Sequence, residues 1–183
     1  MKPTALPPKQ EKKLLNFSKK VGRGINRFGM IGDGDSILLG ISGGKDSLCL
    51  SLALALRRFR VPISYTLTAV FIEWREFSLE QQQKEALQHF FAELEIPLKI
   101  VSAHMFPQSF KNKFNCYLCS RNKKRILFEE AKKLGIGKIA LGHHLDDFIE
   151  TTMMNMFFQG EFSTMMPVQS CFNGRIKLIR RPW

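Results

Sequence analysis

This chain of 183 residues has no long apolar run and only four cysteines. No stretch approaches the roughly 20 consecutive apolar residues that a bilayer span requires. The first 13 residues, MKPTALPPKQEKK, lack the apolar centre of a signal peptide. Four cysteines are too few for a disulfide scaffold in a chain of this size. We therefore expect a cytoplasmic protein with no membrane segment and with reduced cysteines.

Acidic residues are also scarce. The chain has 16 Asp and Glu against 28 Lys and Arg, so its net charge is +12. Such a surplus favours a polyanionic partner, and nucleic acid is the commonest one. A basic surface that only contacts solvent would give the same count.

Apolar patterning predicts strands that alternate with helices. The expected strands are 36–41, 64–74, 98–103, 138–144 and a fifth that begins at 175. The given sequence ends within this fifth strand. The expected helices are 11–29, 47–59, 78–96, 120–134 and 146–160. Alternation of this kind indicates an α/β fold, with a parallel five-stranded sheet covered by helices on both faces. If the protein is naturally short, ending inside the fifth strand would leave an open sheet edge.

The expected domain covers residues 11–183, after a disordered Pro- and Lys-rich tail at 1–10. Ser78 is expected to cap the helix 78–96, with Gln81 completing a capping box. In a parallel α/β sheet, ligands bind outside the carboxyl ends of the strands. The polar motifs described next all lie at such ends.

A glycine-rich, charged loop follows the first expected strand. It consists of Ser42, Gly43, Gly44, Lys45, Asp46 and Ser47. Adjacent glycines allow backbone N–H groups to form a concave nest, and the next helix directs its positive end to the same place. This arrangement favours a phosphate site, although glycines that only permit a tight turn would look alike. The Walker and Rossmann glycine patterns are both absent.

A second polar segment, GHHLDDFIET, begins at Gly142, where the fourth expected strand ends. His143 and His144 are followed by Asp146 and Asp147. Carboxylates beside histidines can bind Mg²⁺ or position a nucleotide. The same residues would also fit a helix cap and a structural histidine.

A close cysteine pair, Cys116 and Cys119, precedes the helix 120–134. A zinc site needs about four ligands, and only Cys49 and Cys171 remain, with nothing to place them nearby. We expect Cys49 to lie in the core. The pair therefore indicates other metal chemistry or redox chemistry, unless it is simply two reduced core thiols.

Positive charge gathers in the helices 11–29 and 120–134, which are the expected contacts for a polyanion. The residues concerned are Lys19, Lys20, Arg23, Arg121, Lys123, Lys124 and Arg125. The positive charges of the helix 120–134 are also expected to lower the pKa values of the neighbouring thiols of Cys116 and Cys119.

The loop SGGKDS between strand and helix resembles the pyrophosphate loop of the N-type ATP pyrophosphatases, the PP-loop superfamily, which cleave ATP into AMP and pyrophosphate. The chain also resembles the tRNA 2-thiocytidine synthetases (TtcA-type) from about Asn16 to Arg181. The segments that carry this resemblance, besides the loop, are VGRGINRFGMIGDGD, CYLCSR, GHHLDD and TTMMNMFFQGEFSTMMP. Lysidine synthetases share the loop but usually lack the cysteine pair and the Met-rich segment.

The resemblance implies that ATP and Mg²⁺ adenylate the C2 oxygen of an anticodon-loop cytidine in tRNA. Sulfur from a donor such as a cysteine desulfurase then displaces AMP and gives 2-thiocytidine. The implied ATP-binding residues are Ser42, Gly43, Gly44, Lys45, Asp46, Ser47, Glu73, Gly142 and His143. Asp46 and Asp147 would be catalytic, and Asp146 and Asp147 would bind Mg²⁺.

The family also holds a 4Fe–4S cluster on three cysteines, of which Cys116 and Cys119 would be two. Family members supply the third cysteine beyond the last strand, whereas Cys171 precedes that strand. The chain is therefore expected to be a fragment, or a shortened protein with an incomplete cluster. Two alternative functions stay open: a remnant that binds tRNA and ATP without catalysis, and a lysidine-type tRNA ligase. The expected assembly is a homodimer.

Overall fold

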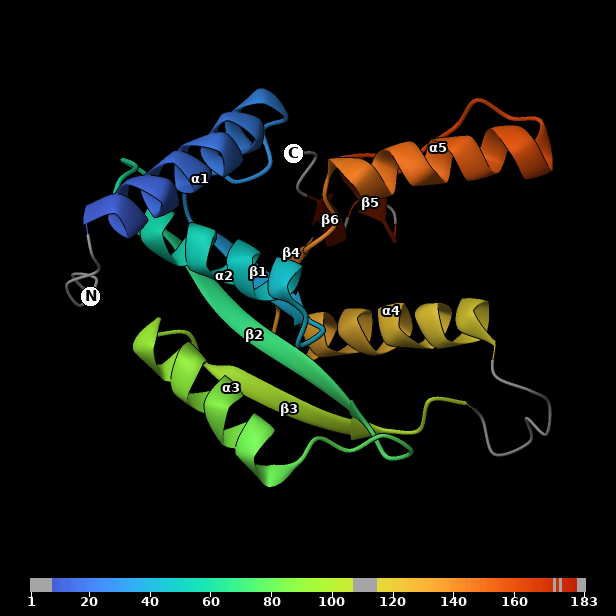
Figure 1. Cartoon of the computed structure of the whole chain (residues 1–183), viewed down its shortest axis with the longest axis horizontal. Coiled ribbons are helices and arrows are strands. Elements are labelled where there is room, and N and C mark those ends of the chain that lie inside the picture. The colour runs from blue at the N-terminus through green and yellow to red at the C-terminus, as the bar shows by residue number, and fades with distance from the viewer. Residues whose placement is uncertain (1–7, 107–114, 173, 175, 181–183) are drawn as a thin grey trace.

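The computed structural model describes residues 8–106, 115–172, 174 and 176–180 (Figure 1). Its helices are α1 (Pro8–Arg27), α2 (Lys45–Arg58), α3 (Gln81–Glu93), α4 (Cys116–Lys133) and α5 (Leu145–Gln159). Its strands are β1 (Asp35–Ile41), β2 (Tyr65–Trp74), β3 (Leu98–Ala103), β4 (Lys138–Leu141), β5 (Val168–Cys171) and β6 (Ile176–Arg180). The expected alternation of strands and helices is confirmed.

The strands form one sheet in the order β3-β2-β1-β4-β6-β5. All neighbours are parallel except β5 and β6, which pair antiparallel. The expected count of five strands is wrong, because β5 is only four residues long and carries polar Gln169 and Ser170 in its middle. The open edge expected at the last strand is also wrong, since β6 lies between β4 and β5.

Two apolar layers enclose the sheet. On one face, α1, α2 and α3 pack against alternate strand residues such as Ile37, Leu39 and Phe71. On the other face, α4 packs against residues of opposite parity, such as Leu38 and Val70. A parallel sheet buried on both faces needs such continuous apolar strands, and these strands supply them.

Helix α5 stands apart from these layers and extends away from the sheet (Figure 1). Phe148 is its one buried residue, while Met153, Met154, Phe157 and Phe158 are exposed. Gly160 ends the helix in the left-handed conformation, at φ 68°, as the position of a glycine there predicts.

Three helices begin three or four residues away from their expected starts, whereas α2 and α5 begin within two residues of theirs. Helix α1 begins at Pro8, inside the segment expected to be disordered, while residues 1–7 lie outside the described part. Helix α3 begins after Glu80, whose backbone N–H donates to the Gln83 side chain at 3.2 Å, so Ser78 does not cap it. Helix α4 begins at Cys116, because the Asn115 side chain accepts from the Leu118 N–H at 3.0 Å.

Candidate active site

A cleft of about 470 Å³ opens at the carboxyl ends of β1 and β4. Its polar and reactive lining residues are Ser42, Asp46, Ser47, Cys116, Cys119, Ser120, Lys123, Lys124, Gly142, His143, His144 and Asp147. The loop after β1, the segment after β4 and the cysteine pair of α4 are separated by tens of residues in sequence, yet they meet here. Of these lining residues, Ser120 and His144 were not among the predicted site residues.

Hydrogen bonds within the glycine-rich loop fix its shape. The Ser47 hydroxyl donates to the Gly44 carbonyl at 2.9 Å and accepts from the Ser42 N–H at 3.3 Å. Gly43 has φ +79°, a conformation that glycine adopts far more readily than other residues. Helix α2 begins directly after Gly44, and because the first N–H groups of an α-helix have no partners within the helix, this end suits an anion.

Gly142 places β4 directly against the start of α2. A Cβ atom at this position would come 2.9 Å from the Ser47 backbone nitrogen and 3.0 Å from the Asp46 carbonyl carbon. Only a residue without a side chain permits this approach. The phosphate loop and the GHH segment therefore form one wall of the cleft.

The two histidines of the GHH segment have different surroundings. Burial, followed by the charge of Arg180, lowers the pKa of His143, which favours the neutral imidazole. Its Nδ1 atom is buried and has no hydrogen-bond partner in the described part of the chain. His144 precedes α5, and its backbone N–H donates to the Asp147 carboxylate at 2.6 Å. Both histidines line the cleft, so their rings border any ligand that binds there.

The cysteine pair lies in the first turn of α4, rather than ahead of the helix as the sequence predicts. Burial raises the pKa of the Cys119 thiol and outweighs the nearby Lys123, which lowers it. The predicted lowering of the thiol pKa is therefore wrong for Cys119. Burial also lowers the pKa of Lys123 itself.

Several predicted site residues lie outside the cleft lining. Glu73 pairs with Lys84 at 2.7 Å and accepts from the Leu79 N–H, so its carboxylate supports the start of α3. Asp146 does not line the cleft: 76% of its side chain is exposed, and its carboxylate lies 3.7 Å from Nδ1 of His144. Cys49 is exposed on α2 instead of lying in the core, and Cys171 belongs to β5. Gly43, Gly44 and Lys45 are also exposed and do not line the cleft.

Donor groups for a metal are sparse in the part of the chain that the structure describes. No three His, Cys, Asp or Glu side chains there are close enough together to hold a metal ion. A 4Fe–4S cluster takes up to four cysteine ligands, and the cleft offers Cys116 and Cys119. These residues therefore do not complete a cluster site, and Asp46 and Asp147 do not by themselves complete a magnesium site.

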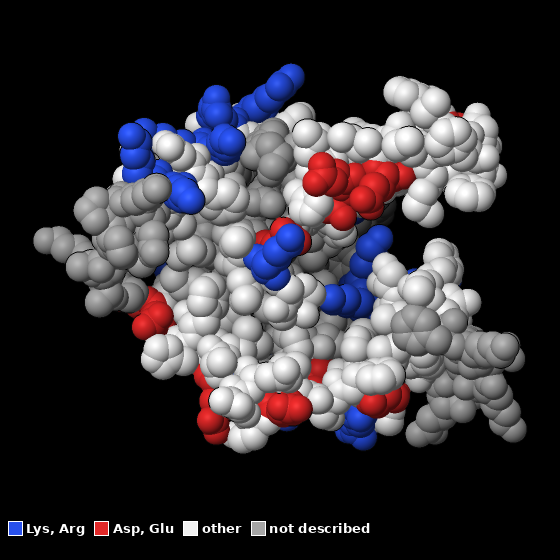
Figure 2. All heavy atoms as spheres, in the orientation of Figure 1, with Lys and Arg blue, Asp and Glu red and all other residues white. Residues whose placement is uncertain are grey.

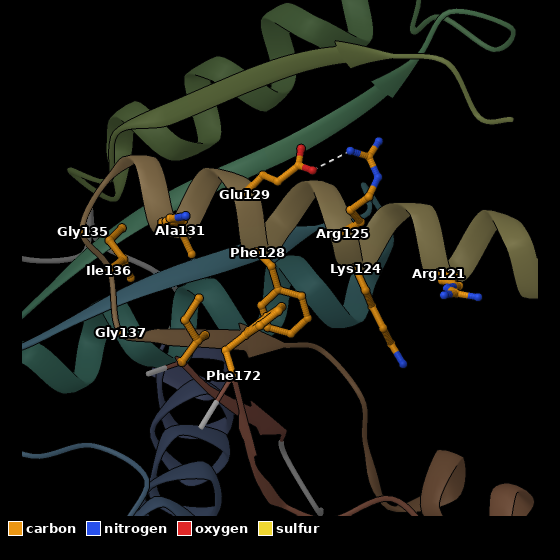
Figure 3. Close-up of a pocket in the computed structure, with 12 residues that line it drawn as sticks. Arg121, Lys124, Arg125, Phe128, Glu129, Ala131, Gly135, Ile136, Gly137 and Phe172 are labelled. Carbon is orange, nitrogen blue, oxygen red and sulfur yellow. Dashed lines mark hydrogen bonds and ion pairs between the residues drawn. The ribbon is translucent and has the colours of Figure 1, made fainter. Parts of the chain in front are cut away.

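The predicted tRNA-binding residues divide between two places. Lys123 and Lys124 line the cleft, and Lys124 also lines a neighbouring groove of about 710 Å³ together with Arg121 and Arg125. In that groove Phe128 and Phe172 meet edge to face, with ring centroids 5.1 Å apart, and Arg125 pairs with Glu129 (Figure 3). Lys19, Lys20 and Arg23 lie on α1 and face a different groove.

No helix in the described part is long and apolar enough to span a bilayer.

The glycine-rich loop, the helix after it and the parallel sheet define a nucleotide-binding α/β domain with a phosphate loop. The PP-loop domain family matches residues 8–183, and the chain belongs to this family. Among solved structures, the U34-tRNA thiolase NcsA from Methanococcus maripaludis, determined with its [4Fe-4S] cluster, has a TM-score of 0.68 and 25% identity, covering 82% of this chain and 52% of that one. An NH3-dependent NAD synthetase from Campylobacter jejuni, at 15% identity and TM-score 0.50, shares the fold.

Curated relatives in bacteria carry the name tRNA-cytidine(32) 2-sulfurtransferase. The protein from Ralstonia pickettii is 38% identical over 90% of this chain and 52% of its own length. The protein from Geobacter sulfurreducens is 40% identical over 87% of this chain and 63% of its own length. The chain thus spans about half to two thirds of the length of these relatives.

Proposed function

We propose that this chain forms the ATP-binding part of a tRNA sulfurtransferase, which converts an anticodon-loop cytidine to 2-thiocytidine. One observation carries the proposal: a single cleft is lined by phosphate-loop residues Ser42, Asp46 and Ser47, by two cysteine thiols and by the histidines of the GHH segment. The names of the curated relatives support this assignment, and the name of the NcsA neighbour, a U34-tRNA thiolase, supports the broader assignment to tRNA thiolation.

ATP would bind with its pyrophosphate end at the first turn of α2. The loop residues 42–47 would surround the phosphates, with Lys45 adding charge from the rim. Gly142 and His143 would face the nucleotide from the other wall. Mg²⁺ usually keeps several waters and binds one or two carboxylates together with phosphate oxygens, so Asp46 and Asp147 are its proposed protein ligands. Glu73 would act only by supporting the fold near the adenosine.

In the proposed reaction, the C2 oxygen of cytidine attacks the α-phosphorus of ATP and pyrophosphate leaves. The C2–O bond is then part of an adenylate, a far better leaving group than the original oxygen. A sulfur nucleophile of the sulfide oxidation state adds to C2, and AMP departs with the oxygen. Lys123 and Lys124 would offset the negative charge that develops on the phosphates.

Cys116 and Cys119 are placed to receive or direct the incoming sulfur, because both line the cleft from α4. We propose that a 4Fe–4S cluster would use both thiols together with ligands outside the described residues. A sulfur donor such as a cysteine desulfurase, a homodimeric assembly and a cytoplasmic location complete the proposal.

The test first reconstitutes the protein anaerobically with iron and sulfide, and then incubates it with unmodified tRNA, Mg²⁺-ATP and sulfide, so that the amount of product can be compared with the amount of bound cluster. We expect 2-thiocytidine in digested tRNA and one pyrophosphate released for each thiolated base. Omission of tRNA should abolish pyrophosphate release. Pyrophosphate release that depends on lysine and leaves cytidine without sulfur would instead identify a lysidine-type ligase, and tRNA binding without either product would identify a non-catalytic remnant.

A further inference from the structure

A second strongly basic region lies at the far end of α2 from the cleft. It is a groove of about 920 Å³ between α1 and the end of α2. Its cations are Lys19, Lys20, Arg23, Arg57 and Arg60, and no Asp or Glu lines it. In Figure 2 the Lys and Arg atoms over α1 form a patch without acidic atoms among them. Within the described residues, none of the five cations pairs with a carboxylate.

Arg57 is held in this groove by two residues of α1. Its Nη2 atom donates to the Asn26 side chain at 2.7 Å. A Cβ atom on Gly22 would come 2.6 Å from its Nη1 atom, so the guanidinium occupies the space that a side chain at position 22 would fill. Glycine in a helix interior costs up to about 1 kcal/mol relative to alanine. Here that glycine permits a fixed arginine on the helix surface.

We infer that this groove binds phosphate groups of the RNA substrate, as a contact separate from the cleft. Arginine presents a rigid fork that suits phosphate oxygens, and lysine adds a mobile point charge. The neutral donors Asn16 and Ser18 also line the groove. Such contacts orient a nucleic acid without reading its sequence. The assignment to tRNA rests on the proposed function.

The distance between groove and cleft suits one RNA molecule. Helix α2 has 14 residues and runs from the cleft to the groove, which corresponds to about 21 Å at 1.5 Å per residue. The cleft and the groove are therefore closer together than one helical turn of a nucleic-acid duplex, which is roughly 34 Å long in DNA. A folded RNA that places a base in the cleft can therefore also contact the groove with its backbone.

The test measures the affinity of the full chain for unmodified tRNA over a range of salt concentrations. The double variant Lys20→Ala/Arg23→Ala removes two groove cations, while Lys12→Ala/Lys13→Ala removes two exposed cations of α1 outside the groove. The groove variant should reduce the slope of log affinity against log salt by about 1.5, at roughly 0.7–0.9 for each lost contact. The control should change the slope much less. Arg57→Gln, which removes the cation that α2 contributes, should reduce the slope by roughly 0.7–0.9.

Equal effects of the groove and control pairs, or full affinity and an unchanged slope in Arg57→Gln, would overturn the groove assignment while leaving the proposed function intact. Inorganic polyphosphate that competes as strongly as tRNA at equal phosphate concentration would also overturn it, since the groove would then be a general polyanion site. Absence of tRNA binding by the unchanged chain would overturn the proposed function as well. Circular dichroism and ATP affinity show whether each variant is folded.

Discussion

Gly142 lies so close to the first turn of α2 that a Cβ atom on it would come 2.9 Å from the backbone nitrogen of Ser47. This contact joins the end of β4 to the phosphate loop, although the two segments are about 95 residues apart in the sequence. The neighbouring atoms belong to backbone, so they cannot move aside as the end of a flexible side chain could. The position of one wall of the cleft therefore depends on the other.

Gly142→Ala should consequently destabilise the fold and disturb the phosphate loop. Overpacking of this kind typically costs about 1–3 kcal/mol, and ATP affinity should fall because the first N–H groups of α2 are displaced. Chemical denaturation and calorimetry measure the two effects. Gly32→Ala is the matched control, because its Cβ would lie 3.6 Å from the nearest atom, an ordinary contact. Equal stability of the two variants would contradict the explanation.

Gly44→Val should affect ligand binding while the fold is retained. Gly44 has φ −77°, which any residue can adopt, and its Cβ would meet only the Ser42 hydroxyl at 3.4 Å. The added side chain would occupy the space where phosphate approaches the backbone. ATP affinity should fall tenfold or more, equivalent to about 1.4 kcal/mol. Gly43→Ala offers a contrast, because its φ of +79° makes a loss of stability the expected primary effect. Unchanged ATP affinity in a folded Gly44→Val protein would count against the site.

The fold was largely predictable because its signals are local. Buried parallel strands are continuous apolar runs, as in 37–39, and glycines such as Gly135 and Gly160 mark helix ends. The missed strand β5 has no such signal, since it is short, half-buried at most and held by pairing with β6. The start of α4 could have been found, because Asn115 is a favourable N-cap residue directly before Cys116.

The composition of the site was only partly predictable. The three motifs are found together because each lies at the carboxyl end of a strand or at the start of the next helix, which the topology rule anticipates. The surroundings of individual groups depend on packing that sequence does not reveal. Burial decides the pKa direction of Cys119, and pairing with Lys84 turns Glu73 toward α3. The groove at Arg57 depends on contact between helices that are distant in sequence.

Glu130 should contribute measurably to stability. Its buried carboxylate bonds to Lys133 at 2.7 Å and to Lys99 at 2.6 Å, and these bonds lower its pKa. Glu130→Ala should cost about 1–2 kcal/mol, because both lysines are partly exposed and can be rehydrated. The neighbouring Glu129→Ala, which removes an exposed pair with Arg125, should cost at most about 0.5 kcal/mol.

The contribution of Glu130 to the free energy of unfolding should decrease as the pH falls. Because the folded pKa of Glu130 lies below its unfolded value, its contribution is complete above the unfolded pKa and disappears as the pH falls through the folded pKa. Denaturation of wild type and Glu130→Gln at neutral and acidic pH tests this. A gap between the two proteins that widens toward low pH would refute the assignment.

Alkylation of Cys119 should require a higher pH than alkylation of the same cysteine in the unfolded chain. Burial disfavours the thiolate and raises the pKa, and Lys123 only partly opposes this effect. Lys123→Gln should move the alkylation curve further toward high pH, whereas Lys124→Gln should move it less. Mass spectrometry of the labelled peptide measures the rates. A curve for Cys119 below that of the unfolded chain would contradict the effect of burial.

Iron should bind weakly to this chain, and through Cys116 and Cys119. Both thiols line the cleft, but no third His, Cys, Asp or Glu groups with them among the described residues. Anaerobic reconstitution with iron and sulfide should therefore give less than one cluster for each chain, which a chelator removes readily. Cys116→Ala and Cys119→Ala should each abolish the remaining visible absorbance. Cys49→Ala, which changes an exposed cysteine outside the cleft, should have no effect. ATP affinity should stay near that of the wild type in all three variants, because the phosphates are expected to bind backbone N–H groups of α2. A stable, stoichiometric cluster in either Cys116→Ala or Cys119→Ala would show that the pair is structural and that sulfur reaches the cleft by another route.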